Sequence, residues 1–169
     1  MGYNISRHIV ENTKYEIYGD TNVAENVLDY VPMAFNELIG NEGSLKIQVS
    51  QAKASVLYPP NGLHTMILGG SGTGKTQLAE AMYYYGVESK TFEKKAPFIV
   101  FNCADYADNP QLLLSQLFGH VKGAFTGADT EKEGLVEKAN GGILFLDEVH
   151  RLPSEGQEIL FYLLDKGRF

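Results

Sequence analysis

The chain is poor in cysteine and in positive charge. Cys103 is the single cysteine among 169 residues, so no disulfide can form within the chain, and this usage suits a reducing compartment. Lysine and arginine together number 14 against 21 acidic residues, which gives a formal net charge of −7 and an isoelectric point near 5.1. Binding to a phosphate backbone needs a basic surface, so this composition argues against DNA binding by the chain itself.

Membrane and metal signals are also scarce. No apolar run reaches the length of a membrane span, and no signal-peptide layout is present. Residues 1–6 fit a myristoylation pattern, but nothing else indicates a membrane, so we expect a cytoplasmic protein with no membrane partner. Its histidines show no metal-ligand spacing (His8, His64, His120 and His150). A hydrophobic fraction of 44% is ordinary for one globular domain or a large part of one.

Residues 69–76 fit the pattern Gly-x-x-x-x-Gly-Lys-[Ser/Thr], between an apolar run at 63–68 and a helical pattern that begins near Lys75. This order forms a phosphate cradle, because glycines let successive backbone N–H groups point inward at a helix N-terminus. Lys75 is expected to reach the terminal phosphates and the Thr76 hydroxyl to ligate Mg²⁺. The flanking elements disfavour a glycine-rich turn without function. The predicted triphosphate site comprises Gly69, Gly70, Ser71, Gly72, Thr73, Gly74, Lys75, Thr76 and Gln77.

Strand and helix patterns alternate along the chain. Apolar runs at 63–68, 97–102 and 143–146 predict strands, and the second is expected to be buried on both faces. Helical patterns cover 44–57, 75–85, 109–118 and the residues from 154 onward. The alternation predicts an α/β fold in three layers, with a central parallel sheet between helices. Residues 1–34 are expected to be a linker or leader, and 35–169 the core.

Local signals predict where the helices begin, end and face the core. Ser44 is expected to cap the first helix, Gly86 to end the second, and Asn109 to cap the third. Ser154 to Gln157 reads as a capping box that opens the last helix. The side chains expected to face inward are Ile47, Ala54 and Leu57, then Leu78, Ala79 and Met82, then Leu112, Leu113, Leu117 and Phe118, and finally Ile159, Leu160, Leu163 and Leu164.

Polar residues follow two of the apolar runs. Asp147 and Glu148 follow the third run, and Asn102 ends the second. In parallel sheets ligands bind beyond the carboxyl ends of the strands, so these side chains are expected at one edge. Asp147 can hold Mg²⁺ there, and Glu148 can polarise a water for attack on the γ-phosphate. A surface Asp-Glu pair is the alternative, which the upstream phosphate loop disfavours.

A glycine-rich loop carries a single aromatic residue at 119–134. Its centre, Gly123-Ala124-Phe125-Thr126-Gly127-Ala128, resembles the signature loop of bacterial activators of sigma-54 RNA polymerase, which are AAA+ ATPases. The phosphate loop, the segment 101–104 and the segment 139–148 occur in the order found in that family. Residues 51–54 and 58–64 are similar to the narrower group of levanase-operon regulators, which respond to sugar phosphotransferase systems. The resemblance covers about 35–169.

The resemblance implies roles for particular residues. Ile39 and Gly40 would lie near the adenine, and Asn102 would hold Glu148 away from the hydrolytic water or release it. Gly123, Ala124, Phe125, Thr126, Gly127 and Ala128 would form the loop that contacts sigma-54, with Phe125 and Thr126 touching it when ATP turnover raises the loop. It also implies ATP and Mg²⁺ as cofactors, a hexameric ring of subunits, and DNA binding through a module outside this sequence.

The sequence departs from the family in two respects. Many members carry acidic residues where Gln116 and Val121 stand, and the family's sensor strand, arginine fingers and helical lid would follow Phe169. We therefore expect the chain to bind ATP with Mg²⁺ but to hydrolyse it slowly. Two other functions remain open. An AAA+ unfoldase subunit could carry Phe125 in a pore loop, and a nucleotide sensor would lack catalysis.

Overall fold

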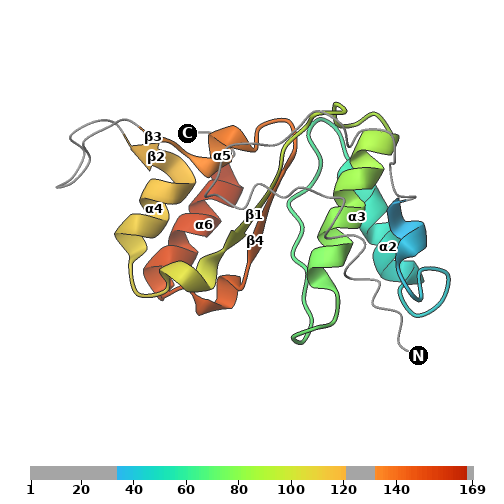
Figure 1. The fold of residues 1–169 in the computed structure, drawn as a ribbon, viewed down its shortest axis with the longest axis horizontal. Helices are drawn as coiled ribbons and strands as arrows, with labels where there is room; N and C mark the ends of the chain where they lie inside the picture. The colour runs from blue at the N-terminus through green and yellow to red at the C-terminus, as the bar shows by residue number, and fades with distance from the viewer. Residues whose placement is uncertain (1–33, 121–131, 167–169) are drawn as a thin grey trace, which may run out of the picture.

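A computed structural model describes residues 34–120 and 132–166. Its centre is a parallel strand pair, β1 (Phe98–Asn102) and β4 (Ile143–Asp147). Figure 1 shows α2 (Lys46–Leu57) and α3 (Lys75–Glu88) on one side of this pair, and α4 (Pro110–Phe118), α5 (Leu135–Lys138) and α6 (Ser154–Lys166) on the other. The order of helix, sheet and helix confirms the predicted α/β architecture with parallel strands. In these two ranges no helix is long and apolar enough to cross a bilayer.

Two hydrophobic clusters hold the layers together. The first joins the 3₁₀ helix η1 (Ala34–Glu37) to α2 and α3 around Phe35, which is 2% exposed. The second joins β1 and β4 to α4, α5 and α6 around Leu113 and Leu117, both fully buried. Each cluster lies on its own side of the sheet, so β1 and β4 are held between two packed helical layers. Truncating a fully buried leucine typically costs about 2–5 kcal/mol.

The predicted strand at 63–68 does not form within the described residues. The segment is extended but has no ladder partner, since β4 pairs with β1 along one edge only. Three of its apolar side chains are exposed, at 52% for Leu63, 72% for Met66 and 84% for Leu68. Ile67 packs against the α2 and α3 cluster. An apolar run predicts a strand only where a neighbouring strand supplies hydrogen-bond partners.

Helix α2 begins two residues later than predicted, and its buried face is different. Leu45 occupies the N-cap position, and no side chain caps the helix. The Leu45 N–H donates to the Gly40 carbonyl at 2.8 Å. Ser44 therefore does not cap it. Ile47, Ala54 and Leu57 are exposed, and the buried residues are Val49, Ala52, Ser55 and Val56. The apolar residues of α2 lie at more than one angle around the helix, so their spacing did not select the inner face.

Helix α3 continues through Gly86 to Glu88, so Gly86 does not end it. Gly86 is buried, and a Cβ there would collide with the Phe92 ring, which packs directly on its backbone. The backbone N–H of Phe92 also donates to the Gly86 carbonyl at 2.9 Å. This glycine serves close packing rather than helix termination. The predicted inner positions Ala79 and Met82 are buried, and Leu78 is half-buried.

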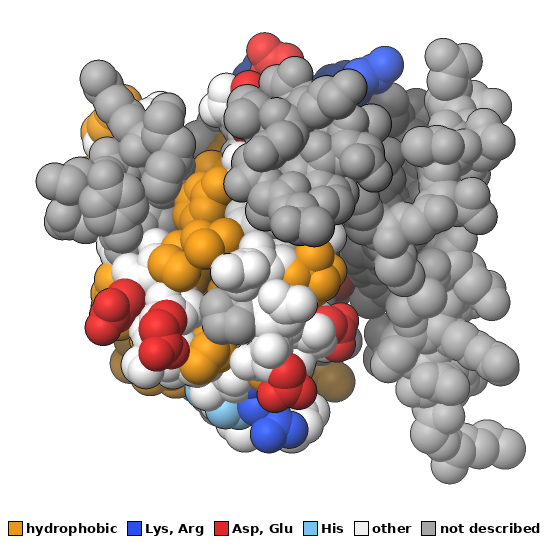
Figure 2. All heavy atoms as spheres, turned by 90° about the vertical axis from the view of Figure 1, so that its left-hand side faces the viewer, with side chains coloured by type: hydrophobic (Ala, Val, Ile, Leu, Met, Phe, Trp, Pro, Cys, Tyr) orange, Lys and Arg blue, Asp and Glu red, His pale blue; other side chains and the backbone are white. Residues whose placement is uncertain are grey.

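Helix α4 has the predicted ends. The Asn109 side chain accepts a hydrogen bond from the Leu112 N–H at 3.0 Å, Pro110 is the first helical residue, and Gly119 follows the last. Leu112, however, is 42% exposed rather than inward. Figure 2 views the molecule from the α4 side and shows hydrophobic side chains reaching the surface between carboxylates.

The start of α6 and the burial of β1 also differ from prediction. Ser154 is the first helical residue, so it cannot be the N-cap of a capping box. Gln157 instead donates to the Leu152 carbonyl at 2.9 Å. Leu160 is buried as predicted, Ile159 is half-buried and Leu164 is 43% exposed. In β1 only Phe101 is buried and Val100 is 38% exposed, so the strand is not covered on both faces.

Candidate functional site

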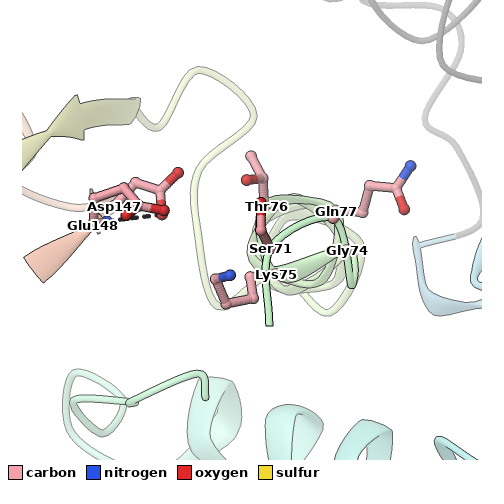
Figure 3. Close-up of a pocket in the computed structure, with 8 residues that line it drawn as sticks. Ser71, Gly74, Lys75, Thr76, Gln77, Asp147 and Glu148 are labelled. Carbon is pink, nitrogen blue, oxygen red and sulfur yellow. Dashed lines mark hydrogen bonds between the residues drawn. The ribbon is translucent and has the colours of Figure 1, made fainter. Parts of the chain in front are cut away.

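The phosphate loop and the end of β4 line one cavity of about 320 Å³. Figure 3 shows Asp147 and Glu148 at the tip of β4, with Lys75 and Thr76 opposite them at the start of α3. The eight lining residues are Ser71, Gly72, Gly74, Lys75, Thr76, Gln77, Asp147 and Glu148. Six of them come from the predicted phosphate loop and the residue after it, and two are the predicted carboxylates. The structure therefore brings the two halves of the predicted site together.

Glycines give the loop its shape at the start of α3. Gly72 and Gly74 have φ values of 74° and 85°, in the left-handed region that non-glycine residues seldom adopt. Gly74 occupies the N-cap position, and no side chain caps the first turn of α3. Backbone N–H groups in such a turn point out of the helix end, where they can bind an anion. The loop thus fits a phosphate by its backbone.

Lys75 folds back over the loop. Its Nζ donates to the carbonyls of Gly69 at 3.2 Å and Gly70 at 3.0 Å, and the Thr73 hydroxyl donates to the Gly70 carbonyl at 2.8 Å. These contacts hold the Lys75 ammonium against the loop that lines the cavity. An ammonium with three donors can exchange carbonyl partners for phosphate oxygens without a change in backbone.

Two oxygen-bearing side chains face each other across the cavity. The Thr76 hydroxyl and the Asp147 carboxylate both line it, from α3 and β4 respectively. Hydroxyl and carboxylate oxygens are the ligand types that Mg²⁺ takes in nucleotide sites, usually together with waters and phosphates. The donor set therefore fits Mg²⁺. In the described ranges no group of three or more His, Cys, Asp or Glu side chains forms a further metal cluster.

Glu148 has an unusual backbone conformation. Its φ is 53° and ψ is 34°, a left-handed conformation that is uncommon for a residue with a side chain. The Glu148 N–H donates to the Asp147 carboxylate at 2.9 Å, which holds that carboxylate against the backbone at the strand end. The Glu148 carboxylate lies 3.5 Å from His150 Nε2. No sequence pattern predicts this histidine contact, because it depends on how the short 3₁₀ helix η3 (Val149–Arg151) follows the strand.

Asn102 pairs with Asp147 in the β1–β4 ladder but does not line the cavity. Its side-chain oxygen accepts from the Ala104 N–H at 3.1 Å, and its side-chain nitrogen donates to Asp105 at 3.2 Å. Asn102 therefore holds the start of the 3₁₀ helix η2 (Cys103–Tyr106). Its backbone position is at the expected edge of the sheet, one strand away from the carboxylates.

The remaining predicted residues lie outside the cavity lining. Ile39, 87% exposed, and Gly40 belong to the turn before α2. Gly69, Gly70 and Thr73 take part in the hydrogen bonds within the loop. The predicted sigma-54 loop, Gly123, Ala124, Phe125, Thr126, Gly127 and Ala128, lies outside the described residues.

Burial changes the chemistry of one group beside the site. Cys103 is fully buried, and this desolvation, with a smaller contribution from the negative charge of Asp147, raises the pKa of its thiol to about 12. The thiol is therefore neutral at physiological pH and a poor nucleophile. It belongs to the cluster that includes Phe101 and Leu113, and its role is packing.

Known proteins resemble this chain over most of its length. The sequence model of the sigma-54 interaction domain matches residues 38–169. The transcriptional regulatory protein LevR of Bacillus subtilis is 62% identical over 132 residues, which is 78% of this chain and 14% of that protein. The transcriptional regulatory protein DagR of Salmonella typhimurium is 48% identical over 161 residues, 95% of this chain and 17% of that protein.

A more distant relative matches a smaller part of this chain. The DNA-binding transcriptional regulator NtrC of Rhizobium meliloti is 44% identical over 107 residues, 63% of this chain and 21% of that protein. The chain thus spans between about one seventh and one fifth of the length of these relatives.

Proposed function

Because the chain belongs to the sigma-54 interaction domain family, with the AAA+ P-loop fold, we propose that it is the ATP-binding core of a sigma-54-dependent transcriptional activator. The observation that supports this best is the shared cavity of the phosphate loop and the β4 carboxylates. The family match favours an activator over an unfoldase subunit or a nucleotide sensor without catalysis.

Nucleotide binding in this proposal is the work of the loop backbone and Lys75. The N–H groups around Gly72 and Gly74 would bind phosphate oxygens, and the Lys75 ammonium would leave its two carbonyl partners for the terminal phosphates. Ser71 and Gln77 would border the nucleotide, since both line the cavity. Ile39 and Gly40 would lie near the adenine, as the family resemblance implies.

Thr76 and Asp147 would hold Mg²⁺ between them, Asp147 directly or through a water. The ion would neutralise charge on the phosphate oxygens during transfer. Glu148 would accept a proton from the attacking water or orient it, because its carboxylate lines the same cavity. Asn102 would govern the position of Glu148 from the adjacent strand.

Full catalysis would require a ring of subunits, taken to be a hexamer. An arginine from a neighbouring subunit stabilises the transferred phosphoryl group in related enzymes and raises the rate by roughly 10³–10⁵. This chain on its own would therefore bind ATP well and hydrolyse it slowly. Fast hydrolysis that does not depend on protein concentration would contradict this.

The ATPase core would act on sigma-54 RNA polymerase in the cytoplasm through a direct contact. Residues 123–128 would make it, with Phe125 and Thr126 at the contact, and a separate module would bind DNA. Similarity to LevR is in keeping with control by a sugar phosphotransferase system, as the levanase-operon resemblance implies.

A binding experiment tests the proposal. Sigma-54 should be retained by this chain when ADP and aluminium fluoride occupy the site, and Phe125→Ala should lose most of that retention. Lys75→Ala should lose it as well, because the loop would no longer hold the nucleotide. Retention that is the same with and without nucleotide, or unchanged in Phe125→Ala, would contradict the activator function.

A further inference from the structure

Two short strands form a stem at the end of α4. Strand β2 (Gly119–His120) follows α4 directly and pairs antiparallel with β3 (Lys132–Glu133), with His120 opposite Lys132. The stem joins the described chain on either side of residues 121–131. Whatever conformation those residues adopt, their two ends are held side by side.

The base of the stem is a crossing of two glycines. Gly119 has a φ of 74°, and a Cβ there would lie 2.7 Å from the Gly134 nitrogen and closer still to the Lys132 carbonyl. A Cβ on Gly134 would likewise lie 2.7 Å from the Gly119 nitrogen. Real Cβ atoms do not approach backbone this closely, so only glycine permits the crossing.

A side chain of each strand of the stem contacts a side chain of α4. Ser115 Oγ and His120 Nδ1 lie 2.8 Å apart, which ties β2 to the helix. Lys132 Nζ donates to Gln116 Oε1 at 2.8 Å, which ties β3 to the next residue of the same helix. Ser115 is buried and Gln116 half-buried, so water competes only in part for these bonds. Both strands of the stem are therefore held against the helix.

Helix α4 connects the stem to the nucleotide edge of the sheet. It packs against η2, which begins directly after Asn102, and its Leu113 and Leu117 share a cluster with Phe101 of β1. Asn102 is opposite Asp147 in the ladder. Packed side chains thus connect the strand ends to α4, and α4 continues directly into the stem.

We propose that Gln116 and Lys132 are positioning residues, whose hydrogen bond fixes the stem to α4 and so sets where residues 121–131 leave the domain. That this segment contacts sigma-54 rests on the proposed function above. The contact joins a neutral acceptor to an ammonium, so a carboxylate at position 116 would keep the bond and add charge attraction. An apolar side chain of similar size would remove it.

Amide hydrogen exchange in the whole chain, without nucleotide, tests the contact directly. Gln116→Leu should speed exchange at residues 119–120 and 132–134 by roughly tenfold, the equivalent of losing one hydrogen bond to a charged group. Gln116→Glu should exchange as slowly as the original chain or more slowly. Gln111→Leu is the matched control, since Gln111 is exposed on the same helix, and it should have no effect.

A double-mutant cycle separates the contact from general helix stability. The effect of Gln116→Leu should be much smaller in a chain that already carries Lys132→Met than in the original chain, because the contact is then already lost. Additive effects, native-like exchange in Gln116→Leu, or an equal effect of Gln111→Leu would overturn the proposal.

Binding to sigma-54 then separates the two proposals. With ADP and aluminium fluoride present, Gln116→Leu should bind roughly five to ten times more weakly, with nucleotide affinity unchanged. If Phe125→Ala binds sigma-54 as well as the original chain does, the proposed activator function is wrong. The amide hydrogen exchange measurements then still test the contact between Gln116 and Lys132. If Phe125→Ala loses binding while Gln116→Leu keeps it, the positioning role fails alone.

Discussion

Asn102 lies directly opposite Asp147 in the parallel β1–β4 ladder, with the two residues at the carboxyl ends of their strands. Their side chains engage different neighbours, since Asn102 bonds Ala104 and Asp105, and Asp147 accepts the Glu148 N–H. The ladder therefore joins the end of β4, which lines the cavity, to the end of β1, from which the chain continues into η2 and α4.

Asp147→Asn is expected to remove the Mg²⁺ contribution to ATP binding. The amide keeps the size of the side chain but loses the charge that a divalent cation needs. ATP affinity measured by calorimetry should differ between Mg²⁺ and EDTA in the original chain, and this difference should disappear in the variant. An unchanged Mg²⁺ dependence would place the metal elsewhere. Lys75→Ala, in contrast, should weaken binding under both conditions.

Glu148→Gln is expected to keep ATP affinity and to slow turnover by roughly 10²–10⁴, because the amide cannot accept a proton from water. His150→Ala is the comparison, since its contact with Glu148 is solvent-exposed and should affect turnover far less. Hydrolysis should be measured at high protein concentration, where any assembly is favoured. Equal losses in the two variants would argue against a separate role for Glu148.

Cys103 should make the fold less stable at alkaline pH. In the unfolded chain the thiol ionises near its ordinary pKa of 9, but in the folded chain it does so only near 12. Between these values the folded state holds one more proton, so the free energy of unfolding falls as pH rises, by about 1.4 kcal/mol per pH unit. Urea unfolding from pH 8 to 11 should show this slope, and Cys103→Ala should lack that component. Equal slopes in both would contradict the assignment.

Gly142→Ala is expected to destabilise the domain by about 1–3 kcal/mol. A Cβ there would lie 2.8 Å from the backbone nitrogen and carbonyl carbon of Pro97, at the point where β4 begins to pair with β1. Gly43→Ala is the matched control, because its Cβ would meet only the Gly40 carbonyl at 3.8 Å. Thermal unfolding should give a lower midpoint for Gly142→Ala than for Gly43→Ala. Similar midpoints would show that the starts of β1 and β4 can move apart to make room for the Cβ.

The sequence predicted which segments meet at the cavity better than it predicted the ends and buried faces of the helices. The residues of the phosphate loop carry their conformational requirement in their identity, since left-handed backbone selects glycine at 72 and 74. Asp147 and Glu148 follow an apolar run, and a parallel ladder then brings them to the edge where Asn102 ends β1. Local chemistry and a simple rule of sheet topology sufficed there.

Prediction failed where the outcome depended on distant contacts. Gly86 looked like a helix stop, yet the Phe92 ring keeps it inside α3. Ile47 and Leu57 fitted an apolar stripe, but the buried side of α2 is the one that meets α3 and η1. The contact between Glu148 and His150 forms just after the end of β4, and the β2–β3 stem forms just after the end of α4. Periodicity and capping signals contain no such information.

The open edge of β4 has a practical consequence. Among the described residues, β4 has no partner on that edge, and the extended segment 63–68 exposes Leu63, Met66 and Leu68. Unpaired strand edges beside exposed apolar side chains promote intermolecular pairing. Concentrated samples of this chain should therefore become turbid on warming, and purification will benefit from low concentration and cold.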